Sequence, residues 1–335
     1  MLGISSGLHF EGSLREFDPS VLSGLITWYD FSDHTFVDKA SGVDVVATDT
    51  TQDLFQIQNK WNLVSTNENF PIDINGQNPN GYFMGEFLRT PSSDNTPDWI
   101  NPSGLVNSNF SSRHGDFTGV YDLGGGTNNG SRYLRTVTSI GGGTSSSETI
   151  SLDNFSFYIV FKQDVASPTT PDGGRQVLVW MEGEKSSSDT EGRKITLEKS
   201  AGAASGGGRY FLYLYEDGSV SATISAGSYT VDTSTKILGF NVNSSTAGTS
   251  IGRMYQSGDA TYEDTSENGV ATTMTGGATS APNTSFLGSR GPAVLANDPD
   301  RTFDGHMCEI VMYNRALDAG EQTELEEYFK EKWNI

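Results

Sequence analysis

The side chains that could do chemistry in this chain are mainly carboxylates, and their spacing argues against hydrolysis. A retaining glycoside hydrolase needs two carboxyl groups about 5 Å apart. Glu182 and Glu184 come nearest to such a pair, but they stand at a predicted strand end beside a turn rich in Lys and Ser. A solvated turn explains this position better. There is also no Gly-x-Ser-x-Gly motif between a strand and a helix, and the glycines at 124–126 lack the residues of a phosphate-binding loop. We therefore expect no enzymatic activity.

Oxygen ligands for a cation gather near the C-terminal end of the chain. Asp298, Asp300 and Asp304 lie close together, and Ca²⁺ prefers carboxylate and carbonyl oxygens. Clusters of Asp and Pro are also ordinary turn chemistry, so both interpretations stay open. The histidines are far apart in sequence, and none stands at metal-ligand spacing from another. Calcium at this aspartate cluster is the cofactor that the sequence offers.

Sugar binding would require exposed aromatic planes beside polar groups. Trp99, in a polar stretch from Asp98 to Asn101, and Tyr82 meet this description, and we take them as the candidate carbohydrate-binding residues. An aromatic side chain in a loop more often packs against its own loop, so this alternative stays open. Trp28 and Trp180 stand within strand-like runs, where we expect them to be buried.

These candidates must be positioned by a scaffold rich in β-strands. The chain has 335 residues with 39 Gly, and its hydrophobic content is 35%. Such a composition is typical of many short strands joined by polar turns. Strands are predicted at 22–31, 132–137, 155–162, 176–181, 194–199, 210–215, 220–224 and 237–242. Glycine-rich connectors between them favour an all-β antiparallel sandwich.

The end of the chain predicts a buried strand followed by a helix. From Met307 the residues alternate, which places Met307 and Glu309 on one face and Cys308 and Ile310 on the other. Both faces are apolar enough to be buried. Asp318 and Glu321 have the spacing of a capping box. Apolar residues then recur at helical spacing, namely Leu325, Tyr328, Phe329 and Trp333. This helix should pack on a sheet.

These motifs carry a family resemblance. The run from Phe303 through Tyr313-Asn314-Arg315-Ala316-Leu317 to the final Lys-Trp resembles the ending of concanavalin A-like lectin/glucanase domains of the laminin-G-like jelly-roll type. The segment from Leu22 to Asp30 resembles their first strand, which pairs near the last one. The resemblance spans roughly 22–335, with poorly matching stretches between. It implies a jelly-roll sandwich with long loops and one C-terminal helix. Glucanases of this family carry Glu-x-Asp-x-x-Glu on one strand, and this chain lacks that pattern.

The sequence divides into an N-terminal arm and one large domain. Residues 1–21 form a glycine-containing arm that could serve as an anchoring segment, or could fold back on its own domain. Residues 22–335 form the sandwich, with an irregular insertion at about 35–130 that is rich in Asn, Pro, Gly and Ser. Long loop sets of this kind tend to carry contacts or function.

The net charge and the cysteine content limit the kinds of partner and covalent link that this chain can have. The net charge of −21 makes nucleic acid an improbable partner, because binding it requires a positive surface. The single cysteine, Cys308, allows no disulfide within the chain and should be buried. We see neither a signal peptide nor a run of roughly 18 apolar residues that could span a membrane.

Together these features resemble structural proteins of tailed-phage virions. The resemblance implies a capsid decoration, fibre or baseplate component that is made in the host cytoplasm and located in the virion. Its partners would be other virion proteins, bound through the arm in a symmetric oligomeric assembly, and a surface glycan. A carbohydrate-binding module is the alternative, and a glycoside hydrolase is the less favoured one.

Overall fold

The structure is a computed structural model that describes most of the long strands, the C-terminal helix and parts of the connecting segments. The described residues are 17–40, 43–44, 51–53, 56–58, 60, 87–89, 98–100, 114–116, 134–136, 151–152, 154–163, 176–182, 194–199, 207–216, 219–230, 233–243, 249–256, 262–264, 267–269, 274–275, 284–288, 303 and 305–335. None of the helices in these ranges is long and apolar enough to cross a membrane.

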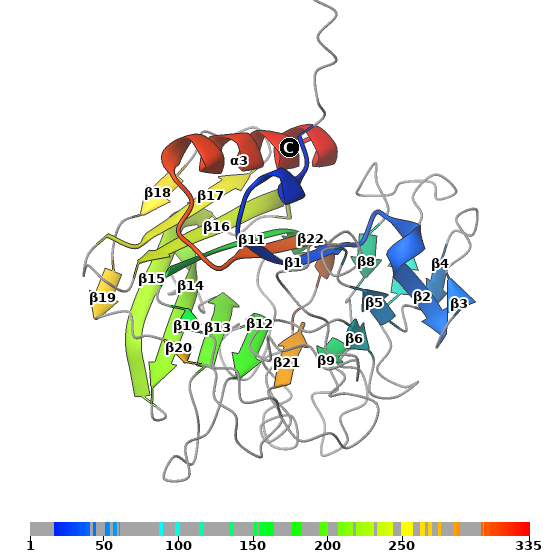
Figure 1. Ribbon diagram of the computed structural model, residues 1–335, viewed down its shortest axis with the longest axis horizontal. Coiled ribbons are helices and arrows are strands. Elements are labelled where there is room, and N and C mark those ends of the chain that lie inside the picture. Colours follow the sequence, from blue (N-terminus) through cyan, green and yellow to red (C-terminus); the bar gives the residue numbers. More distant parts are fainter. Residues whose placement is uncertain are drawn as a thin grey trace, which may run out of the picture.

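Two antiparallel sheets form the body of the protein, and the helix α3 (Ala319–Trp333) covers the outer face of one of them (Figure 1). We call this sheet the helix-covered sheet. Its strand order is β18-β17-β16-β11-β22-β8-β7-β4, and β1 also pairs with β22. Its strands are β1 (Leu25–Asp30), β4 (Thr51–Asp53), β7 (Asp98–Ile100), β8 (His114–Asp116), β11 (Asn154–Gln163), β16 (Thr235–Asn243), β17 (Ile251–Gln256), β18 (Tyr262–Asp264) and β22 (Gly305–Tyr313).

The second sheet has the order β19-β15-β14-β13-β12-β21-β9-β6-β5-β2-β3. Its strands are β2 (Val37–Ala40), β3 (Val43–Asp44), β5 (Gln56–Gln58), β6 (Phe87–Arg89), β9 (Leu134–Thr136), β12 (Gln176–Glu182), β13 (Lys194–Lys199), β14 (Gly207–Glu216), β15 (Ser219–Thr230), β19 (Glu267–Gly269) and β21 (Thr284–Leu287). A separate pair consists of β10 (Ser151–Leu152) and β20 (Met274–Thr275). The predicted all-β antiparallel sandwich with a C-terminal helix is confirmed.

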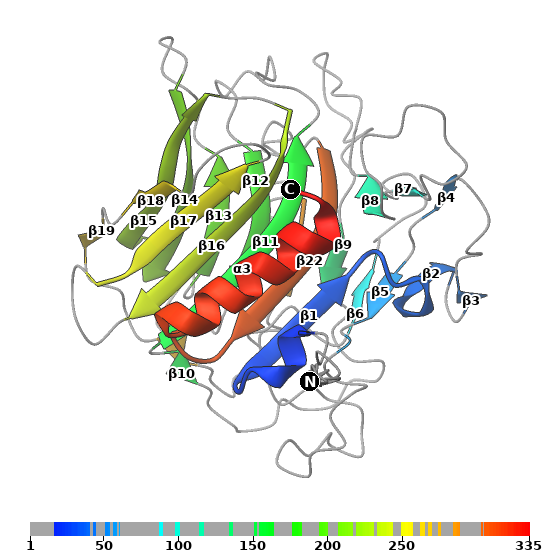
Figure 2. The same cartoon turned by 90° about the horizontal axis from the view of Figure 1, so that it is seen from above.

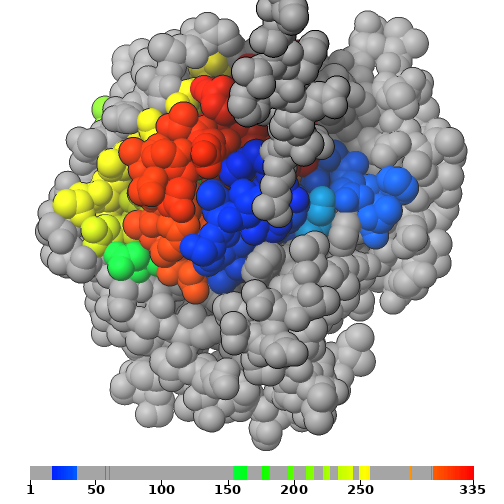
Figure 3. Space-filling view, turned by 45° about the horizontal axis from the view of Figure 1, so that its top comes forward, coloured from blue at the N-terminus to red at the C-terminus, as the bar shows by residue number. Residues whose placement is uncertain are grey.

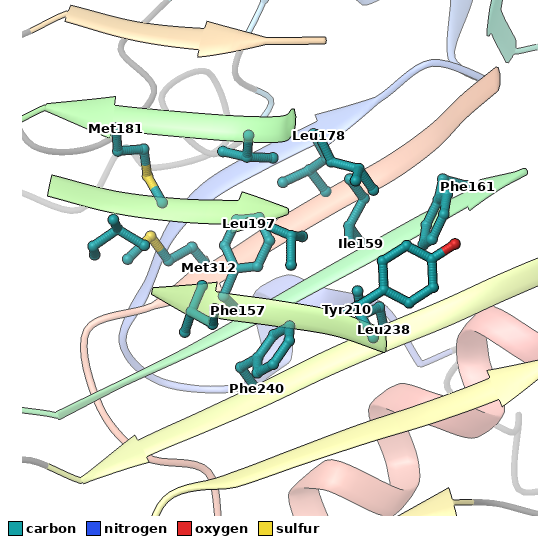
Figure 4. Packing of buried hydrophobic residues seen from close by; sticks show 14 of the residues in the cluster. Phe157, Ile159, Phe161, Leu178, Met181, Leu197, Tyr210, Leu238, Phe240 and Met312 are labelled. Carbon is teal, nitrogen blue, oxygen red and sulfur yellow. The ribbon is translucent and has the colours of Figure 1, made fainter. Parts of the chain in front are cut away.

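The space between the sheets is filled by apolar side chains from both (Figure 4). Alternate residues of β11, from Phe155 to Phe161, point inward, as the sequence pattern predicts. Leu178, Leu197 and Leu212 from the second sheet pack against them. All of these side chains are almost completely buried, and each such burial contributes roughly 1.5–3 kcal/mol. This interior cluster is what holds the two sheets together.

The helix α3 lies across the helix-covered sheet (Figure 2), and a second apolar cluster joins the two. Leu325, Phe329 and Trp333 of the helix pack on outward-facing residues of the sheet such as Tyr158 and Val311. The predicted capping box is present, because Asp318 accepts hydrogen bonds from the backbone of the first turn and Glu321 bonds back to the cap. Trp28 and Cys308 are buried in this region, as predicted.

The alternation predicted for the last strand is wrong at its beginning. Met307 belongs to the interior cluster together with Ile310. Cys308 belongs instead to the outer cluster, beneath α3. The cause is a β-bulge: Val160 pairs with Glu309 and Phe161 with Met307, so that Cys308 is the extra residue. The burial predicted for both faces of this strand is confirmed.

The N-terminal end of the described chain lies beside α3 (Figure 3). The short 3₁₀ helices are η1 (Pro19–Val21) and η2 (His34–Phe36). The Tyr313 hydroxyl donates a hydrogen bond to the Pro19 carbonyl at 3.0 Å, and the ring of Phe17 contacts Tyr328 with centroids 5.8 Å apart. β1 pairs with β22 along its length, which confirms the predicted neighbourhood of first and last strands. Residues 1–16 of the predicted arm lie outside the described residues.

The predicted insertion at 35–130 contributes short strands to both sheets. β4, β7 and β8 continue the helix-covered sheet beyond β22, and β2, β3, β5 and β6 continue the second sheet beyond β9. Each of these strands is only two to four residues long. The insertion is therefore joined to the sandwich by backbone pairing in the part that the structure describes.

Candidate functional site

The outer face of the second sheet carries an aromatic and polar row that its strand alternation creates. In β14, Tyr210 and Leu212 point into the interior, so Phe211 and Tyr213 point outward. Backbone pairing places Tyr213 between Thr196 on β13 and Thr223 on β15. We call Phe211, Tyr213 and Thr223 the aromatic platform. All three are half-buried, so part of each side chain remains accessible.

The two rings of the platform are stacked against each other on neighbouring outward-facing positions of β14. Their centroids lie 5.5 Å apart with an interplanar angle of 30°. Towards β12 the row continues through Thr196 to Trp180, both of which are buried. The Thr196 hydroxyl is fully buried, and it has no hydrogen-bond partner among the described residues. Partly accessible aromatic rings beside the Thr223 hydroxyl suit a ligand with apolar C–H faces and many hydroxyls.

Trp180 is buried as predicted, but it is not part of either apolar cluster. Its neighbours on β12, Val179 and Met181, both point into the interior. A β-bulge between Val177 and Val179 sets this alternation, which turns Trp180 to the outer face.

A second arrangement with possible chemistry lies beneath α3, and it contains two buried carboxylates. We call Asp30, Lys60, Glu309 and Lys332 the Glu309 cluster. Lys332 Nζ lies 2.8 Å from both Asp30 Oδ2 and Glu309 Oε2. Lys60 Nζ lies 3.1 Å from Asp30 Oδ2 and 4.2 Å from the centroid of the Trp28 ring. Paired acids next to a lysine would be the starting point for acid–base catalysis.

The pKa values of the two acids diverge. Burial raises the pKa of Asp30, but the opposite charges of Lys332 and Lys60 outweigh burial and lower it to about 2. Burial dominates at Glu309 and raises the pKa of that carboxyl, although Lys332 acts in the other direction. The pKa of Lys332 is raised because the attraction of Glu309 and Asp30 exceeds the effect of its burial. Two carboxyls with separated pKa values are a common feature of catalytic pairs.

The hydrogen bonds show that these acids have a structural role instead. Glu309 Oε1 accepts from Trp28 Nε1 at 2.7 Å and from the Tyr328 hydroxyl at 2.8 Å. Glu309 Oε2 accepts from Trp333 Nε1 at 2.9 Å and from Lys332 at 2.8 Å. Both oxygens are thus occupied, and the carboxylate is fully buried. A group in this state binds α3 to the sheet and has no free lone pair to offer a substrate.

The sequence-predicted site residues are not brought together in the part of the chain that the structure describes. Trp99 lies in β7, where its backbone pairs with Gln52 and Gly115. Tyr82, Asp298, Asp300 and Asp304 lie outside the described residues. Within the described ranges, no three His, Cys, Asp or Glu side chains are grouped as a metal site would require.

The aromatic platform was missed by sequence reasoning, although a signal was present. From Phe211 to Tyr215 every second residue is aromatic, and the preceding residue, Tyr210, is aromatic as well. Because aromatic residues occur on both faces of this strand, the pattern does not by itself tell interior from exterior. The Gly-x-Ser-x-Gly spacing at 248–252 leads into a strand and not a helix, since Ser250 directly precedes β17. This position fits no nucleophile elbow.

Comparison with known proteins yields similarities of fold only. No protein-family model matches the chain, and no curated protein does. Among solved structures, it is similar to the heptameric SAP-like pentraxin from Limulus polyphemus, with 12% identity and a TM-score of 0.37, over 62% of this chain and 78% of that one. It is also similar to the Trypanosoma rangeli sialidase in complex with the inhibitor DANA, with 16% identity and a TM-score of 0.32.

The sialidase match covers 68% of this chain and 29% of the sialidase, so this chain spans less than a third of that protein's length. The leech intramolecular trans-sialidase matches over 51% of this chain and 22% of its own, with 14% identity and a TM-score of 0.27. Similarities of this size assign no activity, because one fold supports many functions.

Proposed function

We propose that this chain is a non-enzymatic structural protein of a virion, a decoration, fibre or baseplate component that contacts a surface glycan through its sandwich. The observation that supports this best is the aromatic platform, where two stacked rings and a threonine hydroxyl lie on the outer face of a rigid sheet. Sites built on strands hold their side chains more firmly than loops do. The virion assignment rests on the resemblance of the sequence to tailed-phage proteins.

The structural role of the two buried carboxylates supports the proposed absence of enzymatic activity. Asp30 and Glu309 are engaged in ion pairs and hydrogen bonds that attach α3 and the segment after β1. Attachment to other virion proteins would use the N-terminal arm, since the described residues from Phe17 onward lie on the helix-covered face, whereas the platform lies on the opposite sheet. Calcium bound by Asp298, Asp300 and Asp304 remains part of this proposal as a loop-stabilising ion.

The virion assignment is tested by locating the protein in particles. Mass spectrometry of purified particles from the source culture should find the chain at a fixed, symmetric copy number, and imaging should place its density on a capsid or tail. Detection only as free protein would overturn the virion assignment. The glycan-binding module without a particle role would then be the better description.

Glycan contact is tested by a platform variant. We expect Tyr213→Ala to weaken binding to whichever glycan is selected on an array by at least about tenfold, which corresponds to 1.4 kcal/mol. The reason is that the variant removes one of the two stacked rings. Tyr213→Phe keeps the ring and should bind within about threefold of the original protein, and circular dichroism should show that both variants are folded.

The carbohydrate-binding residues predicted from the sequence provide the alternative outcome of this experiment. If Trp99→Ala or Tyr82→Ala abolishes binding while Tyr213→Ala leaves it unchanged, the glycan site lies in the insertion and the platform is not the site. The array should be repeated with calcium and with a chelator. A loss of binding with the chelator that Asp300→Asn reproduces would support the calcium proposal.

A further inference from the structure

The carboxylate of Asp30 lies where α3 and the insertion at 35–130 meet. Asp30 is the last residue of β1, and its side chain is only 4% exposed. Its Oδ1 atom accepts hydrogen bonds from the backbone and the hydroxyl of Ser32 in the turn that follows. Its Oδ2 atom lies 2.8 Å from Lys332 Nζ and 3.1 Å from Lys60 Nζ. One carboxylate oxygen therefore contacts two ammonium groups.

The two lysines belong to elements in different layers of the protein. Lys332 stands in the last turn of α3, on the outer face of the helix-covered sheet. Lys60 follows β5, a strand of the second sheet that pairs with β2 and β6. The strand β1 runs beside α3 and then leads towards β2 (Figure 2). Asp30 therefore attaches both α3 and the insertion to the same strand.

Each lysine also has a second acidic neighbour of its own. Lys60 Nζ lies 3.0 Å from Asp33 Oδ2, and Lys332 Nζ lies 2.8 Å from Glu309 Oε2. Lys332 also donates to the Tyr328 hydroxyl at 3.0 Å, and the Tyr328 ring contacts the N-terminal segment. Either lysine can therefore leave Asp30 without losing every anionic partner.

Two cations at one oxygen atom oppose each other. Both ammonium groups are attracted to Asp30, but they repel one another at short range. Burial raises the pKa of Asp30, whereas Lys332 and Lys60 both act in the other direction and lower it to about 2, so both cations act on this one carboxylate. Withdrawal of one lysine removes the repulsion and leaves the other bound more strongly. Withdrawal of both leaves a buried carboxylate without either cation, which is a far less stable state.

We propose that α3 and the insertion compete for the Asp30 carboxylate, so that displacement of Lys332 strengthens the hold of Lys60 on β1. Any contact that lifts the last turn of α3 would then fix the insertion more firmly to the sandwich. The coupling is reciprocal, because a coupling free energy acts equally in both directions. It does not depend on the virion or glycan-binding proposals, since every contact in it lies within this chain.

A double-mutant cycle on the full chain tests this proposal. Urea unfolding is measured for the original protein, Lys60→Met, Lys332→Met and the double variant. We expect Lys60→Met to raise the unfolding equilibrium constant by a factor that is at least about fivefold larger in the Lys332→Met background than in the original protein. The comparison cancels the contacts that each lysine makes with its other neighbours. If the double variant does not fold, the same cycle with Lys60→Gln and Lys332→Gln replaces it, because glutamine retains a donor on a neutral side chain.

Two control cycles identify the cause of the coupling. Lys330→Met combined with Lys60→Met should be additive within about twofold, because Lys330 pairs with Glu327 on the surface of the same helix. In an Asp30→Asn background, the effects of Lys60→Met and Lys332→Met should likewise be additive within about twofold. A neutral side chain no longer holds the two ammonium groups at one oxygen, so they are free to move apart.

The outcomes decide the proposal in both directions. An effect of Lys60→Met that is equal in the two backgrounds, or smaller in the Lys332→Met background, would overturn it. Coupling that persists in the Asp30→Asn background would also overturn it, because Asp30 would then not be the shared group. Coupling that appears with Lys332→Met, is absent with Lys330→Met and disappears with Asp30→Asn would establish it.

Discussion

The Glu309→Gln variant should lose about 3 kcal/mol or more of its free energy of unfolding, the range seen when one partner of a buried ion pair is removed. Both carboxylate oxygens of Glu309 accept hydrogen bonds from two donors each. A carboxamide keeps one acceptor oxygen and turns its NH₂ group towards two of those donors. Lys332 then loses one of its two anionic neighbours, and the lost neighbour is fully buried.

Urea-induced unfolding measured by tryptophan fluorescence tests this expectation, because Trp28 and Trp333 both bond to the carboxylate. Glu327→Gln is the matched control. The Glu327 side chain is 65% exposed, and its ion pair with Lys330 on the helix surface should be worth less than about 1 kcal/mol. Similar small losses in both variants would show that the Glu309 cluster does not hold α3 to the sheet.

The packing of α3 on the sheet could be predicted from the sequence, whereas the buried carboxylate of Glu309 that holds the helix there could not. The apolar spacing of Leu325, Phe329 and Trp333 predicts a buried helix face, and the structure confirms it. The same pattern does not indicate that Trp333 also donates to a carboxylate 24 residues earlier in the chain. A Glu within an apolar strand is a visible anomaly, but its hydrogen-bond partners come from β1 and α3. Only the folded arrangement brings them together.

The strand faces that form the candidate sites also include some that the sequence predicts and some that it does not. Period-two alternation predicts which strand residues share a face, so the inward set from Phe155 to Phe161 follows directly. A β-bulge interrupts this alternation. For this reason Met307 and Cys308 lie on the faces opposite to those predicted, and Trp180 points outward. Lys60 and Lys332 come from elements that are far apart in sequence and in different layers. No local pattern predicts that both would contact Asp30.

The Gly252→Ala variant should be destabilised by about 2–3 kcal/mol, in the range found when an interior is overpacked. Gly252 lies in β17 at the edge of the sandwich where β17 approaches β15 of the other sheet. A Cβ atom at this position would lie 2.5 Å from the Ser225 carbonyl oxygen and 2.9 Å from its carbon. The obstacle is backbone and not a flexible side chain, so it cannot rotate away.

Both strands are also held from their far sides. Gly252 pairs with Phe240 in β16, and Ser225 pairs with Phe211 in β14, so a shift of either strand would disturb an established ladder. Gly320→Ala provides the control, because its nearest neighbour is the Asp318 side chain at 3.2 Å and alanine favours a helix by up to about 1 kcal/mol. Denaturation with urea should therefore separate the two variants by at least about 2 kcal/mol. If Gly252→Ala is as stable as Gly320→Ala, the sheets do not meet backbone to backbone at this edge, and the interior cluster alone must hold them together.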